Sequence, residues 1–422
     1  MASFSYHTLG EETYNSSVYN FVLAVEEHPG NPSESPYLDG NDFATIGVGF
    51  NMHNNSTVLN AVLLKILYPD ESQSSFLAAD ATYVSNIASI VNTTWSDVGD
   101  LQSALDAVMV ARAADSNVSY AHKEATFEFQ NDDLIQHVFE ALQTGHDDNV
   151  TAFVTGANAV PDSSERIALF SLDYNSHNLL GPLLQDAIDG GNRSEAWYQI
   201  RYGSNGDEEA GVAKRRYYES QEFGLYNPGS LDLAEARQIF QMVTHHNSGG
   251  PSDEDSMDHY DNLYGAQVGQ ANSDYDTSVV QTTTLALSAA KTLLIDDYAP
   301  GASIDKIWIT FASTVGGTES TTLDYHTSTT NLLLIGSADD DEITGGSAAD
   351  WLVGGDGADT LDGGPVGGAN TVSYAQDPQN GSVGVVVNLA LGSGLIDHSQ
   401  KMTVAAMQMA DMKVCAHRSY RV

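Results

Sequence analysis

The sequence is poor in cysteine, in basic residues and in long apolar runs, and each shortage excludes something. A single cysteine, Cys415, means that no disulfide can form within the chain. Lysine and arginine together number 16, against 57 aspartates and glutamates, so the formal net charge is −41. Nucleic acids and anionic lipids are bound through basic patches, and we therefore expect neither as a partner. No apolar run is long enough to predict a membrane span.

A Sec-type leader is also missing from the start of the sequence. The first residues, MASFSYH, do not place a cationic segment before an apolar one, so we expect no N-terminal signal peptide. With 422 residues, 41% of them hydrophobic, the chain can bury a large core and is expected to form two or three domains. Its acidity suits calcium binding, a saline setting that screens self-repulsion, or both.

Residues 1–227 read as a helical domain with one β-like interruption. Segment 37–50 has a turn signal at Gly40-Asn41 and continues into the β-like run ATIGVGF. Apolar residues at helical spacing predict helices over 11–27, 56–67, 72–93, 98–113, 122–144, 164–177, 193–201 and 211–223. We therefore predict a mainly helical domain with a small hairpin near its start.

Residues 228–331 carry no functional motif. An amphipathic helix is predicted over 231–244, followed by the sequence SGGP at 248–251 and an acidic stretch at 252–262 that resembles an exposed linker. Residues 282–295 fit a helix or a strand, and residues 306–314 fit a strand. We treat the region as a linker or a small module of unknown role.

A period of nine residues begins at position 336. Glycine opens each unit, an aspartate lies five residues later, and an aliphatic residue lies two beyond that. The glycines are Gly336, Gly345, Gly354 and Gly363; the aspartates are Asp341, Asp350 and Asp359; the aliphatic residues are Ile343, Leu352 and Leu361. The unit GGDGADTLD, which includes Gly357, matches the complete pattern of a glycine-rich turn followed by a short strand.

This pattern resembles the RTX, or haemolysin-type, repeat, which implies a parallel β-roll over residues 332–394. Glycines permit the backbone of the turn, and aspartate and main-chain oxygens are ligands for Ca²⁺. We expect structural calcium at three aspartates and four glycines: Asp341, Asp350, Asp359, Gly336, Gly345, Gly354 and Gly357. Turns on one edge lie two repeats apart, so Asp341 should adjoin Asp359, while Asp350 should face the fourth repeat, where Asn370 replaces an aspartate. The resemblance also implies export through a C-terminal signal, although residues 395–422 form an irregular tail without repeats.

The stretch EEHPGNPSESPYLDGNDFATIGVG, residues 26–49, contains two acidic residues and a hydroxyl near a turn. Glu27, Asp39 and Thr45 stand in order before Ile46-Gly-Val-Gly. This order resembles the active site of phage-type lysozymes, the muramidase family. The resemblance implies that Glu27 is the general acid, and that Asp39 and Thr45 position the attacking water. Inversion at the anomeric carbon would follow if the two carboxyls stand far enough apart for that water.

The resemblance extends over about residues 10–227 and includes an Arg-Arg-x-x-Glu element at 215–219. It implies that Arg215 or Arg216 reaches the catalytic glutamate. Such a cation favours the ionised form of a carboxyl, so burial must oppose it if the glutamate is to act as an acid near neutrality. Other nearby acidic residues are rivals for the two carboxylate roles: Glu26, Glu34 and Asp42.

We therefore predict an α+β protein: a mainly α lysozyme-like domain (1–227), the linker or module (228–331), an all-β parallel β-roll (332–394) and the tail (395–422). The predicted function is a secreted, monomeric peptidoglycan hydrolase that cleaves between N-acetylmuramic acid and N-acetylglucosamine. Calcium is expected to be structural, with no cofactor for catalysis. Two alternatives are a non-catalytic RTX surface protein that binds glycan and a glycosidase acting on chitin-like polymers.

Overall fold

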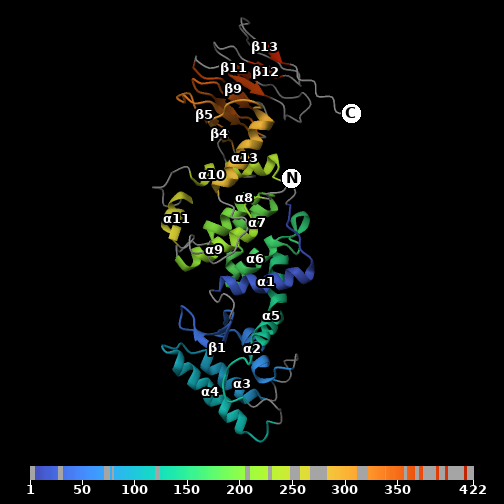
Figure 1. Ribbon diagram of the computed structural model, residues 1–422, viewed down its shortest axis with the longest axis vertical. Helices are drawn as coiled ribbons and strands as arrows, with labels where there is room; N and C mark the ends of the chain where they lie inside the picture. Colours follow the sequence, from blue (N-terminus) through green and yellow to red (C-terminus); the bar gives the residue numbers. More distant parts are fainter. Residues whose placement is uncertain are drawn as a thin grey trace.

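The computed structural model shows an elongated molecule with helices along most of its length and strands near its C-terminal end (Figure 1). It describes residues 5–26, 32–70, 77, 80–118, 124–204, 210–226, 231–247, 257–266, 283–310, 322–337, 339–355, 359–365, 370–373, 386–388, 395–397 and 413–415. Within these ranges, no helix is both long and apolar enough to cross a bilayer.

The N-terminal part is mostly helical with a small antiparallel sheet, as its sequence predicts. Its helices are α1 (Glu11–Val25), α2 (Ser56–Leu67), α3 (Ala81–Val91), α4 (Val98–Ala114), α5 (Asp132–Phe153), α6 (Ser164–Asn175), α7 (Pro182–Asp189), α8 (Arg193–Tyr198) and α9 (Ala210–Phe223). The sheet has the order β1 (Ser33–Leu38), β2 (Ala44–Gly47) and β3 (Phe50–Asn51). Both strand pairs are antiparallel.

Polar side chains fix where several helices begin. Asn55, Asp97, Asn131, Ser163 and Asn192 each precede a helix and accept a hydrogen bond from a main-chain N–H in its first turn. Such a cap satisfies one of the N–H groups that a helix leaves unpaired at its start. The helix predicted over 122–144 consequently begins ten residues later than its apolar pattern alone suggests, after Asn131.

Helix α6 lies at the centre of the helical part, and α5 leads away from it. Residues 165–173 of α6 are all buried, and α1, α5 and α9 pack against this helix. Figure 1 shows α5 running from this bundle to a second group that contains the small sheet and α2–α4. The sheet and the end of α1 meet where the two groups join.

Residues that the sequence suggests are a linker contain helices packed against both neighbouring parts. These helices are α10 (Leu233–His246), α11 (Met257–Leu263) and α13 (Thr283–Tyr298). Helix α10 packs against α8, α13 and the first strand of the C-terminal sheets. From α10, Arg237 donates to the carbonyl oxygen of Gly336 at 2.6 Å and Gln241 donates to that of Thr310 at 2.6 Å.

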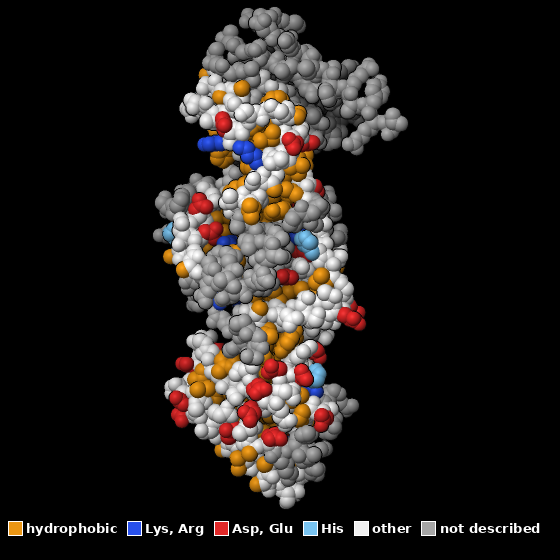
Figure 2. All heavy atoms as spheres, in the orientation of Figure 1, with side chains coloured by type: hydrophobic (Ala, Val, Ile, Leu, Met, Phe, Trp, Pro, Cys, Tyr) orange, Lys and Arg blue, Asp and Glu red, His pale blue; other side chains and the backbone are white. Residues whose placement is uncertain are grey.

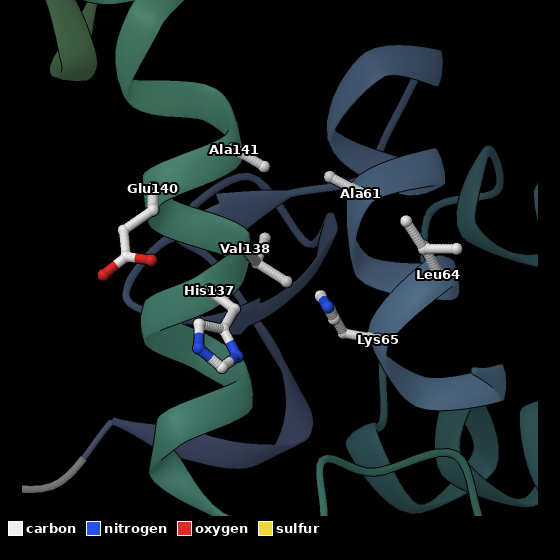
Figure 3. Close-up of a pocket in the computed structure, with 7 residues that line it drawn as sticks. All are labelled: Ala61, Leu64, Lys65, His137, Val138, Glu140 and Ala141. Atoms are coloured by element: carbon white, nitrogen blue, oxygen red, sulfur yellow. The ribbon is translucent and has the colours of Figure 1, made fainter. Parts of the chain in front are cut away.

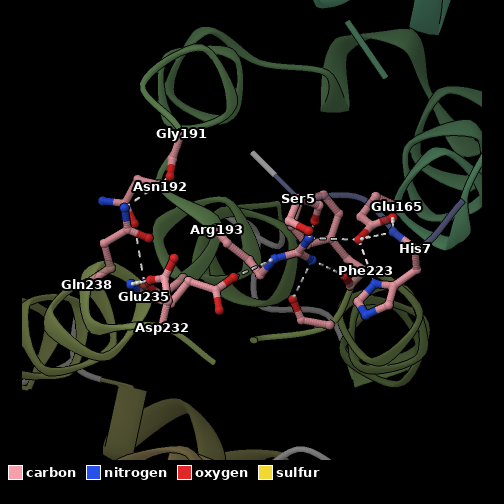
Figure 4. Close-up of polar contacts among 12 residues, drawn as sticks. Ser5, His7, Glu165, Gly191, Asn192, Arg193, Phe223, Asp232, Glu235 and Gln238 are labelled. Atoms are coloured by element: carbon pink, nitrogen blue, oxygen red, sulfur yellow. Dashed lines mark hydrogen bonds and ion pairs between the residues drawn. The ribbon is translucent and has the colours of Figure 1, made fainter. Parts of the chain in front are cut away.

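A buried arginine joins α10 to the helical bundle (Figure 4). Arg193 lies 2.8 Å from Glu165 of α6 and 3.5 Å from Glu235 of α10. It also donates to the carbonyl oxygen of Phe223 at 3.0 Å, beyond which α9 ends. Removing one member of such a buried group leaves a charge without its partner, which is strongly destabilising. This cluster therefore holds four helices, α6, α8, α9 and α10, in one arrangement.

The C-terminal strands form two parallel sheets. They are β4 (Lys306–Ile309), β5 (Thr322–Asp324), β6 (Leu332–Ile335), β7 (Glu342–Thr344), β8 (Trp351–Val353), β9 (Thr360–Asp362), β10 (Thr371–Ser373), β11 (Val386–Asn388), β12 (Leu395–Asp397) and β13 (Lys413–Cys415). The sheet orders are β13-β12-β10-β8-β6-β4 and β11-β9-β7-β5. From β4 to β12, successive strands alternate between the sheets, which is the arrangement of a β-roll.

Aliphatic side chains from both sheets meet in a buried core: Leu332, Leu334, Ile343, Leu352, Leu361 and Val372. Three of these are the aliphatic positions of the nine-residue unit, which explains their periodic spacing. The sheets extend beyond the repeats in both directions, because β4 and β5 precede residue 332 and β12 and β13 follow residue 394.

Candidate calcium turns and a candidate glycosidase site

The repeat aspartates lie at the turns of the roll, on two edges. On one edge, the N–H of Asp341 donates to Oδ1 of Asp359 at 3.0 Å, and the N–H of Thr360 donates to the carbonyl oxygen of Asp341 at 2.7 Å. These two aspartates belong to units two repeats apart. The nine-residue register predicts this neighbour relationship, and the structure has it.

The other edge contains Asp350 and the substituted fourth repeat. The N–H of Asp350 donates to the side-chain oxygen of Asn370 at 2.9 Å. Asp350 itself accepts from the N–H groups of Leu332 at 2.9 Å and Gly346 at 2.6 Å. A neutral amide thus stands beside Asp350 where the first edge has a second carboxylate. The first edge is therefore the better cation site.

The first edge fits a cation. Asp341 is 2% exposed, and its Oδ1 has no hydrogen-bond partner among the described residues. Burial raises the pKa of Asp341, against hydrogen bonds from Ser337 that lower it. A buried carboxylate of this kind is stabilised by a bound cation, which restores the favourable environment that its charge lost on leaving water.

Glycines are required where the turns touch. A Cβ atom on Gly336 would lie 1.8 Å from the carbonyl oxygen of Gly354, and one on Gly345 would lie 2.7 Å from Oδ2 of Asp350. Main-chain carbonyls and carboxylates therefore crowd the same space. The described residues contain no cluster of three or more His, Cys, Asp or Glu side chains suited to a metal, so a calcium ion here would depend on main-chain oxygens as well. Gly357 lies outside the described residues.

A second group of predicted residues meets where α1, α6, α9 and the small sheet come together. Glu26, directly after α1, accepts a hydrogen bond from Nη1 of Arg215 on α9, 189 positions further along the chain. Arg215 is 8% exposed, whereas the Glu26 side chain keeps 21% of its surface. Glu27 lies outside the described residues, so its predicted role stays a prediction. Among the described residues, Arg215 contacts two glutamates: Glu26, which is the rival of Glu27, and Glu219 of α9.

The Ile-Gly-Val-Gly turn lies directly against Glu26. Gly49 has φ +93°, and a Cβ atom there would lie 3.0 Å from Oε2 of Glu26. The hydroxyl of Tyr174 on α6 donates to the carbonyl oxygen of Val48 at 3.0 Å, which fastens the same turn to the bundle. Burial, together with the negative charge of Glu26, raises the pKa of Tyr37 and of Tyr174. Both hydroxyls are therefore neutral neighbours of this carboxylate.

Asp39 and Thr45 lie within the sheet and are engaged there. Oδ1 of Asp39 accepts from the N–H groups of Asn41 at 2.9 Å and Phe43 at 3.0 Å, and Oδ2 accepts from the side chain of Asn51 at 2.8 Å. Thr45 is 2% exposed, and its hydroxyl donates to the carbonyl oxygen of Phe43 at 3.2 Å. Asp39 therefore holds the hairpin turn together.

The sheet still links Asp39 to Glu26 through Tyr37. Tyr37 pairs with Thr45 across β1 and β2, and Thr45 pairs with Asn51 across β2 and β3. The charges of both Glu26 and Asp39 act on the Tyr37 hydroxyl, with the effect of Glu26 the larger. The remaining rivals, Glu34 on β1 and Asp42 in the turn, are exposed.

Three residues of this group were missed by sequence reasoning: Tyr37, Tyr174 and Ser171. Tyr37 precedes Asp39 by two positions, so strand alternation places both on one face, and that signal was available. Tyr174 and Ser171 lie on the fully buried α6, where apolar periodicity does not distinguish one face from another. Only the packing of α6 against α9 and the sheet reveals them.

A hollow of about 350 Å³ lies elsewhere, between α2 and α5 (Figure 3). Its lining residues are Ala61, Leu64, Lys65, His137, Val138, Glu140 and Ala141. None of them is a predicted catalytic or calcium-binding residue.

Comparisons with known proteins identify the repeats. Residues 335–365 match the RTX calcium-binding nonapeptide repeat family, in a model of four copies. The predicted RTX repeats are thereby confirmed, and such repeats bind calcium and are typical of secreted proteins. This match covers the repeats alone and does not extend to the helical part.

One short stretch is similar to a curated protein. Over 29 residues the chain is 76% identical to a protein described as a putative MucR family transcriptional regulatory protein, y4pD, of Sinorhizobium fredii (strain NBRC 101917 / NGR234). The stretch is 7% of this chain and covers 17% of that protein's length, so it carries no argument about function. No solved structure matches the chain.

Proposed function

We propose that this protein is a secreted peptidoglycan hydrolase whose calcium-bound roll stabilises its C-terminal part. The observation that supports an enzyme best is the meeting of Glu26, Gly49 and Arg215. Glu26 and Gly49 are the two ends of the stretch 26–49, and Arg215 lies 189 positions after Glu26; both segments resemble motifs of the phage-type lysozymes. A structural helix end has no need of a buried arginine and a left-handed glycine turn against one partly exposed carboxylate.

In the proposed reaction, Glu26 is the general acid. Its proton passes to the glycosidic oxygen between N-acetylmuramic acid and N-acetylglucosamine as the bond to the anomeric carbon breaks. A water molecule, which Asp39 and Thr45 position, adds its oxygen to that carbon from the opposite face, and its proton passes to Asp39. Arg215 fixes the Glu26 carboxyl, and the two neutral tyrosines limit its contact with water.

The calcium ion contributes folding rather than chemistry. Asp341 and Asp359, with the carbonyl oxygens of the glycine turns, would hold it on the first edge of the roll. Metal binding of this kind is coupled to folding. The chain has one cysteine and can form no internal disulfide, so the bound calcium ion would be the cross-link that stabilises the roll.

A non-catalytic glycan-binding role is the second candidate, and one observation favours it. Both side-chain oxygens of Asp39 already accept hydrogen bonds within the hairpin, as described above. If those bonds persist with substrate bound, three of the about four acceptor positions of the Asp39 carboxylate are occupied, and little capacity is left to take a proton from water. Binding without cleavage would then be the outcome.

The test is clearance of a peptidoglycan suspension by the calcium-loaded full-length protein, with analysis of the new reducing ends. Glu26→Gln should lower the rate by about 100-fold or more, the usual contribution of a general acid. Glu12→Gln is the matched control, because Glu12 is exposed in the first turn of α1. Loss of activity in Glu27→Gln but not in Glu26→Gln would restore the assignment that the sequence favours.

Two further results would redirect the proposal. Wild-type protein that binds the suspension but releases no reducing ends would establish the glycan-binding role instead. Faster product release from chitin than from peptidoglycan would move the substrate to chitin-like polymers.

A further inference from the structure

Glu219 of α9 is a fully buried carboxylate that the proposed reaction does not use directly. It is 0% exposed and lies one helical turn after Arg215. Its Oε1 accepts from Nε of Arg215 at 3.1 Å and from the hydroxyl of Ser171 at 2.7 Å. Its Oε2 lies 3.0 Å from Nη1 of Arg216. The Glu219 carboxylate therefore contacts three groups: Arg215, Arg216 and Ser171.

Glu219 and Ser171 together determine the orientation of Arg215. Nε of the guanidinium is bound to Glu219, and Nη2 donates to the carbonyl oxygen of Ser171 at 3.0 Å and to its hydroxyl at 3.2 Å. The remaining nitrogen, Nη1, is the one that meets Glu26. Because a guanidinium is planar and rigid, fixing two nitrogens fixes the direction of the third.

Glu219 also balances charge in a site that is mostly withdrawn from water. Arg215 and Arg216 are both buried, and among the described residues the carboxylates paired with them are Glu26 and Glu219. Two cations thus face two anions. Without Glu219, two guanidinium groups would face Glu26 alone and would hold it in the ionised form, which cannot donate a proton.

We propose that Glu219 is a positioning residue that takes up part of the charge of the arginine pair, so that Glu26 can carry a proton when substrate binds. This inference rests on the proposed function. It answers how an acid can work beside a buried arginine, since burial of Glu26 alone is incomplete.

Other charged or titratable groups around Glu26 and Glu219 come from several elements. From α9 they are Arg215 and Arg216; from α6, Tyr174; from β1, Tyr37; and from α11, Tyr260, whose charge acts on Arg216. Burial opposes the positive charge of Arg215, but the charges of Glu26 and Glu219 outweigh it and raise the pKa of that guanidinium. Arg215 therefore stays cationic. Substitution of Glu219 by an uncharged residue is what changes the net charge that acts on Glu26.

The experiment compares pH–rate profiles of peptidoglycan cleavage for wild type, Glu219→Gln and the control Glu12→Gln. Glutamine keeps the shape of the side chain and removes its charge. The alkaline limb, where the acid loses its proton, should move to lower pH by about one unit, a shift typical of an uncompensated nearby charge. Activity at a pH well above the wild-type alkaline limb should fall by about tenfold, while activity on the plateau below that limb should stay within about twofold. Glu12→Gln should leave the profile unchanged.

Ser171→Ala separates positioning from charge. It removes one hydrogen bond to Glu219 and one to Arg215 but no charge, so kcat should fall while the alkaline limb stays in place. This variant also keeps the test decisive if Glu219→Gln does not fold, because unchanged kcat in folded Ser171→Ala would overturn the positioning role.

The inference and the proposed function fail in different ways. An inactive wild-type protein refutes the proposed function. An active wild type, with a Glu219→Gln variant that loses the same fraction of its rate at every pH, shows that Glu219 is only structural and overturns the inference. An alkaline limb that moves to higher pH would overturn it as well.

Discussion

At the scale of single residues, Asp341 and Glu26 each contact a residue from another part of the chain: Asp359, 18 positions away, and Arg215, 189 positions away. The partner of a repeat aspartate follows from the nine-residue spacing, because each turn is formed within nine residues and lies beside the turn two units further on. Glu26 has no such repeat around it, because the arginine that contacts its carboxyl, Arg215, lies 189 positions further along the chain.

Gly336→Ala tests the close contact of the repeat turns. The added methyl group would overlap the carbonyl oxygen of Gly354, so the roll should lose about 2 kcal/mol or more of calcium-dependent stability. Thermal unfolding of the variant and of the wild type, both with saturating calcium, measures this loss of stability. Gly145→Ala is the control, because a Cβ atom there meets nothing within 4 Å in the middle of α5, and it should be neutral or stabilising. Equal melting of Gly336→Ala and wild type would contradict the packed turn.

At the scale of elements, the apolar periods identified helices and strands but not their limits. Apolar spacing suggested a helix over 122–144, whereas α5 occupies Asp132–Phe153. Its start is decided by the capping bond of Asn131. Its end lies further on because the long helix continues into the contacts with α6. Strands of three residues, such as β7 and β9, carry too little pattern to be recognised without their repeat.

Asn131→Ala should weaken the start of α5. Its side chain accepts the N–H of Leu134 at 3.2 Å, and the loss of such a cap costs about 1 kcal/mol. The free energy of unfolding of the helical part, from denaturant titration, measures this cost. Gln136→Ala lies one turn inside the same helix and should change that energy by less than about 0.5 kcal/mol. Equal effects of both substitutions would show that the cap does not stabilise α5.

At the scale of the whole molecule, the described acidic side chains on the face drawn in Figure 2 are scattered and do not form a single patch. Figure 2 shows Asp and Glu side chains scattered over the part that holds the small sheet and α2–α4. Such self-repulsion is screened by salt and is relieved locally by bound cations. Helix α10 connects the central helical bundle to the roll, because its Glu235 pairs with Arg193 of α8 and its Arg237 donates to the carbonyl oxygen of Gly336.

Removal of calcium should unfold the roll and leave the helical part folded. The buried carboxylate of Asp341 would lose its counter-ion, whereas the core of the helical bundle contains no metal ligand that we predict. Calorimetry with and without a chelator should show the C-terminal transition shift to lower temperature while the other transition moves by no more than about 2 °C. A single unchanged melting curve would contradict calcium binding by the repeats.

The sequence by itself determined the roll, the helical class of the N-terminal part and the exclusion of disulfides, because each follows from composition or from patterns shorter than a few turns. Only the tertiary structure decided which glutamate Arg215 meets, that Glu219 and Ser171 orient that arginine, and that residues 228–331 contribute helices and strands to both neighbours. Those relations depend on contacts between residues far apart in the chain. The side-chain directions that bring these residues into contact are set by tertiary packing, which a local sequence pattern does not predict.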